Sequence, residues 1–458
     1  MWATSLASSR STWPPPRTRG SSVTLASFGP GSAPLRGTLA VPGDKSLSHR
    51  AVLFAALAEG TSCVTGVLDS EDVRATVGAV TALGASVTLA EDATGALEGT
   101  VTGWGATGPS QPAGPIDCGN SGTTARLLMG VLAGWPVTVT LTGDESLSRR
   151  PMRRVTGPLG TMGASFATTD AGTLPVTVTG TDSLAPIHYD SPVASAQVKT
   201  AILLAGLRAH GTVSVTEPTL SRDHTERLLP AFGVPVAVSG PATASVTGPA
   251  VPTAVDVAVP GDPSSAAFLA VAAALVPGSD ITITGVSLNP TRCGYLRVLE
   301  RMGADLTIAE KPAFGAEPIG DVRIRHHAGL SGTVVTAEEV PSLVDEVPVL
   351  ALLATGASGT TRFEGVAELR VKESDRLAAI GEGLTALGAT VRSGQDWLEV
   401  DGPAQLHGAT LDSLGDHRLA MTWALAGLVA DAPVHIERFE AVAVSWPRFE
   451  SDLASLSE

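Results

Sequence analysis

The sequence lacks several features that mark common protein classes. Only 3 of its 458 residues are cysteines, which is too few for a disulfide framework, and their spacing does not suggest zinc. The longest apolar run, Ala266 to Val276, is about half as long as a membrane-spanning helix. A net charge of -15 argues against a main role in binding nucleic acid or anionic lipid. We therefore expect a cytoplasmic protein with no nucleic-acid or membrane partner.

Motifs of the common nucleotide-binding and hydrolase folds are missing as well. The chain has no GxxxxGK(S/T) loop and no GxSxG elbow, which excludes the sites that depend on them. Cys118 beside Gly119 is a conceivable nucleophile. A small residue at the end of a strand is the simpler interpretation.

The N-terminal segment differs in composition from the rest of the chain. Its first 43 residues contain no acidic side chain. Residues 1–33 are rich in Ser, Pro and Arg and lack the continuous apolar stretch of a secretory signal. This composition predicts a disordered extension or an over-long translation start, and a transit peptide is the alternative.

What the sequence does contain is an internal repeat. Six segments share a plan of turn, Ala/Leu-rich helix, Gly or Pro, and alternating Val/Thr strand. They begin at Gly43, Gly119, Val193, Gly261, Pro341 and Gly415, so that successive starts lie 76, 74, 68, 80 and 74 residues apart. The helices are apolar nearly all round, which indicates burial among sheets. We predict six sheets around buried helices, in two clusters of three, with the last copy truncated at Glu458.

A second helix and strand follow within five of the copies. Their common signature is a hydrophobic residue, a Gly and a small residue before an alternating strand: Leu83-Gly84-Ala85, Met162-Gly163-Ala164, Phe232-Gly233-Val234, Met302-Gly303-Ala304 and Leu387-Gly388-Ala389. We expect each of these glycines to end its helix in the left-handed region of backbone space.

Polar and charged side chains gather at the starts of the predicted buried helices. A helix N-terminus carries free N–H groups and partial positive charge, so it favours anions. Ordinary capping explains Asp262 and Ser264. It does not explain Lys45, Arg50 and Arg126, because an unpaired cation on a buried helix is costly. We therefore predict bound anions at these three residues.

Two further basic clusters lie outside the helix starts. Leu147 to Arg154 holds four arginines; a solvated face is an alternative to an anion site, and the acidic net charge disfavours a nucleic-acid patch. In the second cluster, Arg370 to Arg376, we predict that Lys372 and Arg376 share one helix face and point at one ligand. Glu373 between them could act as a general acid or base, or could merely pair with its neighbours.

Seven short motifs occur from about residue 34 to the end of the chain. They are GDKSLSHR (43–50), GNSGTTAR (119–126), RRPM (149–152), SAQVK (195–199), SRDHTE (221–226), RVKESDRL (370–377) and GDHRLAM (415–421). In this order they resemble the 5-enolpyruvylshikimate-3-phosphate (EPSP) synthase family. The SAQVK and RDHTE sequences resemble the bacterial branch that includes glyphosate-tolerant members.

The resemblance implies an α/β (α+β) fold of two inverse αβ-barrel domains built from six βαβαββ repeats, three per domain. Two crossovers near Val41-Pro42-Gly43 and Val259-Pro260-Gly261 share one turn sequence. We therefore expect an N-terminal extension at 1–33, a discontinuous domain formed by 34–42 and 260–458, and an inserted domain at 43–259. The active site would lie in the cleft between the two domains.

The resemblance also implies a reaction. The enolpyruvyl group of phosphoenolpyruvate would move to the 5-hydroxyl of shikimate-3-phosphate, and phosphate would be released. This step would belong to chorismate and aromatic amino-acid biosynthesis. By motif, shikimate-3-phosphate would be bound by Lys45, Ser46, Arg50, Ser195, Ala196, Gln197, Arg222, Asp345 and Lys372. Phosphoenolpyruvate would be bound by Lys45, Asn120, Gly122, Arg126, Arg150, Gln197, Arg376 and Arg418, with Arg126 either in direct contact or a near neighbour.

The family's chemistry is an addition followed by an elimination, which implies no metal and no cofactor. The catalytic residues carried over by motif are Lys45, Asp345 and Glu373. Glu373 would protonate the methylene carbon of phosphoenolpyruvate while Asp345 accepts the proton of the 5-hydroxyl. Glu346 is a rival base.

Two positions bear on the inhibitor glyphosate. Many family members have a Lys where this chain has Val444, so that contact with phosphoenolpyruvate is absent or comes from elsewhere. Gly122 stands where tolerant members can have Ala, whose methyl group obstructs glyphosate. We expect inhibition that competes with phosphoenolpyruvate, unless the change at Val444 weakens binding.

Two other functions deserve comparison with this one. UDP-N-acetylglucosamine enolpyruvyl transferase shares the fold, but it would show a Lys-Asn-Ala start and a reactive loop cysteine, whereas Ser46 follows Lys45 here. A module that only binds phosphorylated metabolites would not need both Asp345 and Glu373. We therefore expect the synthase, acting as a monomer.

Overall fold

The six predicted buried helices are all present in the computed structural model, which describes residues 25–30 and 33–457. They are α1 (Lys45–Leu57), α3 (Gly122–Ala133), α6 (Ala196–Gly206), α8 (Pro263–Leu275), α10 (Val347–Ala354) and α12 (His417–Val429). In α8, Asp262 caps the first turn by accepting the Ser264 N–H, and every residue from Pro263 to Ala274 is buried. The apolar sequence therefore forms helices inside the lobes, as predicted.

Three of the six sheets surround α1, α3 and α6. In spatial order their strands are β14 (Val257–Ala258), β3 (Thr61–Val67), β5 (Leu97–Thr102) and β4 (Ser86–Glu91); β6 (Ile116–Asp117), β7 (Thr138–Thr142), β9 (Val176–Thr179) and β8 (Ser165–Ala167); and β10 (His188–Asp190), β11 (Gly211–Thr216), β13 (Thr243–Gly248) and β12 (Ala237–Ser239). The accompanying helices are α2 (Glu71–Ala82), α4 (Glu145–Ser148), α5 (Arg153–Thr161) and α7 (His224–Leu228).

The other three sheets surround α8, α10 and α12. Their strands are β2 (Arg36–Ala40), β15 (Asp280–Ser287), β17 (Glu317–Arg325) and β16 (Asp305–Phe314); β18 (Val334–Val335), β19 (Gly359–Glu364), β21 (Trp397–Gly402) and β20 (Thr390–Ser393); and β22 (Thr410–Asp412), β23 (Val434–Glu437) and β1 (Leu25–Phe28). The accompanying helices are α9 (Gly294–Arg301), α11 (Arg376–Ala386) and α13 (Phe449–Ser455).

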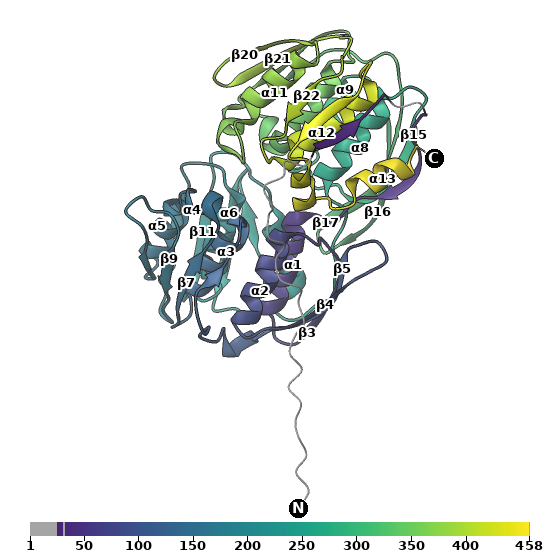
Figure 1. The fold of residues 1–458 in the computed structure, drawn as a ribbon. Helices are drawn as coiled ribbons and strands as arrows, with labels where there is room; N and C mark the ends of the chain where they lie inside the picture. The colour runs from purple at the N-terminus through teal and green to yellow at the C-terminus, as the bar shows by residue number, and fades with distance from the viewer. Residues whose placement is uncertain (1–24, 31–32, 458) are drawn as a thin grey trace, which may run out of the picture.

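The sheets form two lobes, each with its own hydrophobic core (Figure 1). We call the first the inserted lobe, because its core runs from Leu47 to Val259. We call the second the terminal lobe, because its core combines Leu35 and Val41 with residues 266–456. In each four-stranded sheet the first two strands are parallel and the rest antiparallel, which is the βαβαββ plan. The five glycines expected after the second helices all have positive φ.

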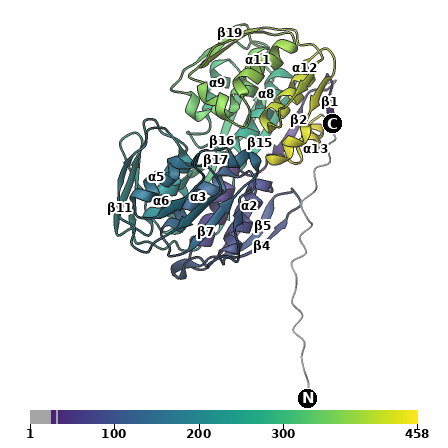
Figure 2. The same ribbon diagram turned by 60° about the vertical axis from the view of Figure 1, so that its left-hand side comes forward.

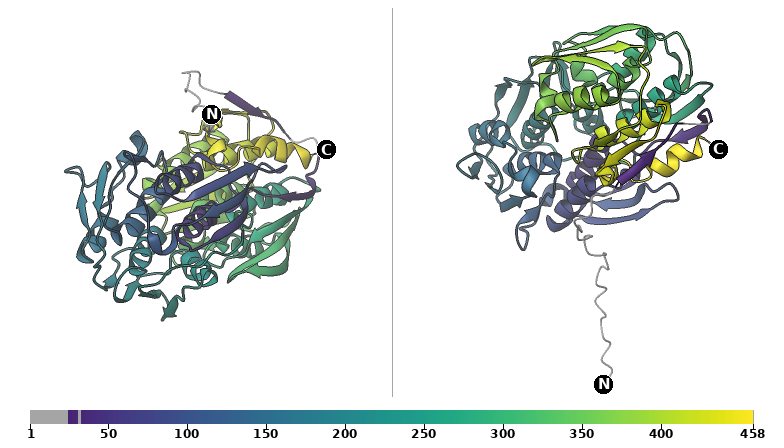
Figure 3. Two further views of the ribbon diagram at one scale, coloured as in Figure 1. Left: turned by 90° about the horizontal axis from the view of Figure 1, so that it is seen from below. Right: turned by 45° about the horizontal axis from the view of Figure 1, so that its top comes forward.

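The structure differs from the expectation of a disordered segment at 1–33. Residues 1–24 and 31–32 lie outside the described residues, but Leu25–Phe28 form β1, which pairs antiparallel with β23 (Figure 2). Among residues 25–30 and 33–457 the sixth repeat supplies β22 and β23 to this sheet, and β1 covers the edge of β23 that would otherwise be open. The purple N-terminal strands accordingly lie among the yellow elements of the terminal lobe (Figure 3).

The two crossovers between the lobes run side by side. Gly43 and Gly261 form an isolated antiparallel bridge. The Asp44 N–H donates to the Pro260 carbonyl at 2.8 Å, and the Asp262 N–H donates to the Pro42 carbonyl at 2.8 Å. A Cβ atom at position 43 would lie 1.9 Å from the Gly66 carbonyl oxygen, so only Gly fits. This pairing brings the N-termini of α1 and α8 together at the cleft.

Candidate active site

The first two turns of α1 carry two of the predicted anion-binding cations. Lys45 Nζ lies 3.1 Å from Asp72 Oδ2 of α2. Arg50 is buried, and its guanidinium donates to the hydroxyls of Thr200 and Thr225, each at 2.9 Å. Burial lowers the pKa of Arg50 to about 10, against the attraction of Glu226 and Asp44. A buried guanidinium held mainly by hydroxyls keeps its charge available to an anion.

The starts of α3 and α6 form one connected cluster. Arg126 donates to Gln197 Oε1 at 2.6 Å, and Gln197 Nε2 donates to the Thr123 hydroxyl at 2.9 Å. Arg150 donates to Asn120 Oδ1 at 2.9 Å. Burial lowers the pKa of Arg126 to about 10, with repulsion from Arg150 and Arg154 in the same direction. Within the described part of the chain, neither Arg126 nor Arg150 has a carboxylate in ion-pair contact, and this cluster is suited to a second anion.

Asp345 is the point where cations from both lobes meet. Arg222 of the inserted lobe is hydrogen-bonded to its carboxylate, and three cations of the terminal lobe complete the ring: Arg376 at 3.0 Å, Lys372 at 3.7 Å and Arg418 at 3.7 Å. Burial alone would raise the pKa of Asp345, but the four cations hold it well below its usual value. Asp345 is therefore ionised, and the cations that keep it ionised also lower its strength as a base.

Glu373 lies next to this ring. Its Oε2 accepts from Arg376 at 2.6 Å, while Arg376 Nε donates to Asp416 at 2.7 Å. Desolvation opposes ionisation of Glu373, although 37% of its side chain remains exposed, and Arg376 and His417 lower its pKa far below the usual range. With these neighbours Glu373 is a carboxylate.

The prediction that Lys372 and Arg376 share one helix face is wrong. The 3-10 turn at Ala367–Val371 ends before Lys372, and α11 begins only at Arg376. The Asp375 side chain accepts the Ala378 N–H and caps α11 there, which stops the helix from extending backwards. Both cations still reach Asp345, Lys372 at 3.7 Å and Arg376 at 3.0 Å.

Glu346, the rival base, has a different environment from Asp345. It accepts a hydrogen bond from Ser264 and lies 3.6 Å from Arg418. Burial, reinforced by the neighbouring Asp345 charge, raises the pKa of Glu346 even though Arg418 opposes this. The adjacent carboxylates are thus driven apart in pKa, and Asp345 is the one held as the anion.

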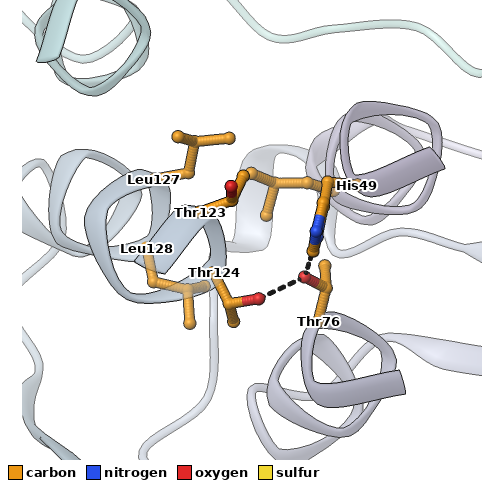
Figure 4. A pocket seen from close by; sticks show the side chains of 7 residues that line it. His49, Thr76, Thr123, Thr124, Leu127 and Leu128 are labelled. Atoms are coloured by element: carbon orange, nitrogen blue, oxygen red, sulfur yellow. Dashed lines mark hydrogen bonds between the residues drawn. The ribbon is translucent and has the colours of Figure 1, made fainter. Parts of the chain in front are cut away.

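A chain of hydrogen bonds joins α1, α2 and α3 of the inserted lobe (Figure 4). His49 Nδ1 lies 2.7 Å from the Thr76 hydroxyl, which lies 2.6 Å from that of Thr124. Thr124 in turn donates to Ser121, the cap of α3, at 2.7 Å. Burial lowers the pKa of His49 to about 3, so its ring is neutral. The chain holds the α3 start in position relative to α1.

A pocket between the lobes gathers predicted residues from distant parts of the sequence. Its lining includes Lys45, Ser46, Arg222 and Arg418, with Ser445 directly after Val444. Lys45 is also close enough to Glu373 to lower the pKa of that carboxyl. The cluster of Asn120, Gly122, Arg126, Arg150 and Gln197 does not line this pocket.

Sequence reasoning missed several partners of the site residues. Asp72 anchors Lys45, Asp416 anchors Arg376, and Arg292 lies between Asp44 and Asp262 at 2.8 and 3.0 Å. The only sequence signal was that each acid stands at or near a helix start, where capping explains it equally well.

The fold matches that of the enolpyruvyl transferase NikO from Streptomyces tendae. That structure is 23% identical, with a TM-score of 0.73, and the match covers 94% of this chain and 97% of that chain. The two lobes thus share the fold of that structure.

More similar relatives show which family the chain belongs to. The family model of EPSP synthase (3-phosphoshikimate 1-carboxyvinyltransferase) matches residues 30–453. The 3-phosphoshikimate 1-carboxyvinyltransferase of Halorhodospira halophila is 50% identical over 92% of this chain and 93% of that protein. The structure of EPSP synthase from Acinetobacter baumannii is 42% identical, with a TM-score of 0.86 over 95% of this chain and 98% of that chain. The chain belongs to the EPSP synthase family, and it is a transferase that moves the enolpyruvyl group of phosphoenolpyruvate to shikimate-3-phosphate in aromatic amino-acid biosynthesis.

Proposed function

We propose that the residues carried over by motif bind the two substrates of this reaction on either side of the Asp345 ring. Shikimate-3-phosphate is assigned to Lys45, Ser46, Arg50, Ser195, Ala196, Gln197, Arg222, Asp345 and Lys372. Phosphoenolpyruvate is assigned to Lys45, Asn120, Gly122, Arg126, Arg150, Gln197, Arg376 and Arg418. The observation that carries the proposal is the meeting of Arg222, Lys372, Arg376 and Arg418 at one carboxylate.

The proposed chemistry has two steps. In the addition, the 5-hydroxyl oxygen bonds to C2 of phosphoenolpyruvate, Asp345 takes the hydroxyl proton, and Glu373 donates a proton to the methylene carbon, which becomes a methyl group. In the elimination, the methyl group loses a proton to Glu373 and the double bond re-forms. The bond between C2 and the phosphate oxygen breaks, and the leaving phosphate takes the proton held by Asp345. Lys45 and the arginines stabilise the charge on phosphate and carboxylate.

Substrate binding supplies the proton donor that the substrate-free site lacks. Arg376 holds the pKa of Glu373 low by direct contact. An anionic substrate group bound to Arg376 offsets that positive charge, and desolvation of the closed site then raises the pKa of Glu373. Protonation of Glu373 is thereby coupled to occupancy of the site.

The domain boundaries, subunit state and location belong to the same proposal. The inserted domain at 43–259 closes against the domain formed by 34–42 and 260–458 through the paired crossovers. The exposed large apolar side chains are scattered over both lobes, which supports a monomer. Three free cysteines and metabolic substrates support the cytoplasm.

Phosphate release from phosphoenolpyruvate tests the proposed activity. We expect release by the purified protein only when shikimate-3-phosphate is also present. A folded sample that releases no phosphate would contradict the assignment, and light scattering of the same sample checks the monomer.

A further inference from the structure

A buried acid outside the assigned site connects two substrate-binding segments. Glu217 follows β11 and is 4% exposed. Its Oε1 accepts the Ser195 N–H at 2.7 Å, at the start of α6. Its Oε2 accepts the Ser221 hydroxyl at 2.7 Å and the Ser221 N–H at 3.3 Å, directly before Arg222. One carboxylate thus fastens two loops that are distant in the sequence.

The charge of Glu217 is balanced on its buried side. Lys199 Nζ lies 2.8 Å from Glu217 Oε2 and 2.7 Å from Glu226 Oε1, and its side chain is 1% exposed. Lys199 therefore stands between two carboxylates, of which only Glu217 touches Ser195 and Ser221. Substitution of Glu226 therefore removes an ion pair of Lys199 without touching the loops, whereas substitution of Glu217 affects both.

We propose that Glu217 is a positioning residue for shikimate-3-phosphate, which sets the distance between the α6 start and the Arg222 loop. This inference rests on the proposed assignment of Ser195 and Arg222 to that substrate. A carboxylate suits the task because it only accepts, so it can serve donors on both loops and Lys199 at once. An amide of the same shape must turn its NH₂ group toward at least one of these donors.

The two isosteric variants Glu217→Gln and Glu226→Gln provide a matched test. Each leaves Lys199 with one buried carboxylate, but only the first disturbs the loops. We expect Glu217→Gln to raise the KM for shikimate-3-phosphate about tenfold, with a much smaller change in the KM for phosphoenolpyruvate. Glu226→Gln should leave both KM values near those of the parent enzyme, because Glu226 contacts neither loop. The KM is compared and not the kcat, because inactive or unfolded molecules lower the apparent kcat but leave the KM unchanged.

Two additional variants make the outcome decisive. Ser221→Ala removes one donor and keeps the carboxylate, so it should raise the same KM in the same direction even where Glu217→Gln fails to fold. Arg222→Gln tests the underlying assignment, because an unchanged KM for shikimate-3-phosphate there would reject the proposed binding loop itself. Suppose that Arg222→Gln raises the KM for shikimate-3-phosphate, so that the binding assignment stands. The positioning role is then overturned if Glu217→Gln and Ser221→Ala leave this KM unchanged. It is also overturned if Glu226→Gln raises this KM as much as Glu217→Gln does.

Discussion

Three arginines of the inserted lobe have different partners from Arg376 of the terminal lobe. In the inserted lobe the partners of Arg50, Arg126 and Arg150 are hydroxyl, amide and carbonyl oxygens. In the terminal lobe Arg376 contacts three carboxylates, those of Asp345, Glu373 and Asp416. Neutral partners leave positive charge for a substrate anion, whereas carboxylates cancel it and have their own pKa lowered. Arg376 and its three carboxylates thus lie in the terminal lobe, while three arginines of the inserted lobe keep positive charge that no carboxylate in contact with them cancels, among the residues that the structure describes.

Removing Arg376 should give the largest effect on stability. In Arg376→Gln, the fully buried Asp416 loses its ion-pair partner, which should lower the free energy of unfolding by about 3–5 kcal/mol. Arg150→Gln in the inserted lobe removes a contact to an amide and should cost about 1 kcal/mol. Denaturant unfolding of both variants measures the difference, and equal losses would contradict the contrast between the lobes.

Glu373→Gln should give the largest effect on turnover. The amide cannot deliver a proton, so we expect kcat to fall by about a hundredfold or more, while titration shows nearly unchanged binding of shikimate-3-phosphate. Glu368→Gln is the control. Glu368 lies on the 3-10 turn at Ala367–Val371 and pairs with Lys372, but its side chain is 60% exposed. Loss of substrate binding in Glu373→Gln would make Glu373 structural.

His49 should make the inserted lobe sensitive to acid. Its folded pKa is about 3 against a usual 6.5, so between these values the unfolded chain binds a proton that the folded protein does not. Stability therefore falls as the pH drops below about 6.5, by about 2 kcal/mol between pH 6.5 and pH 5 for this group. His49→Gln should show a shallower pH dependence of unfolding; an unchanged slope would exclude His49 as its source. His417 of the terminal lobe, with a pKa of about 4, should keep its own contribution.

Arg126→Gln tests whether an arginine of the inserted lobe contributes to substrate binding alone. Because this guanidinium has no carboxylate partner among the described residues, its loss should raise the KM for phosphoenolpyruvate about tenfold without moving the pH profile of kcat. Arg154→Gln, in the nearby arginine cluster, is the control for general charge. A shifted pH profile would show that Arg126 also tunes the acids.

Gly122→Ala should have the smallest effect on the uninhibited reaction. An added Cβ would lie 2.8 Å from Arg126 Nη1, the movable end of a flexible side chain. We expect competitive inhibition of the parent enzyme by glyphosate, a higher inhibition constant in the variant and little change in kcat. If the parent enzyme is insensitive to glyphosate, the expectation is wrong and the change at Val444, whose neighbour Ser445 lines the pocket between the lobes, is the explanation to test.

Much of the fold was predictable because each repeat carries its own local signals. The apolar helices, the glycines with positive φ and the shared crossover turn all follow from short segments. The grouping of Lys45, Arg222, Asp345 and Arg418 followed only from motif order and resemblance, since these residues are far apart in the chain. The helix boundary at Arg376 was missed because Asp375 can either continue a helix or cap one.

The sequence by itself determined the six repeats, the buried helices and the cations at their starts, because hydrophobic periodicity and capping act over a few residues. Only the tertiary structure decided that β1 completes the last sheet, that Asp72 and Asp416 anchor the cations, and that Glu217 joins two loops. These contacts depend on which strand edges and buried charges meet after folding. Unpaired edges and charges must find partners wherever the chain brings them, and no local pattern records which partner that is.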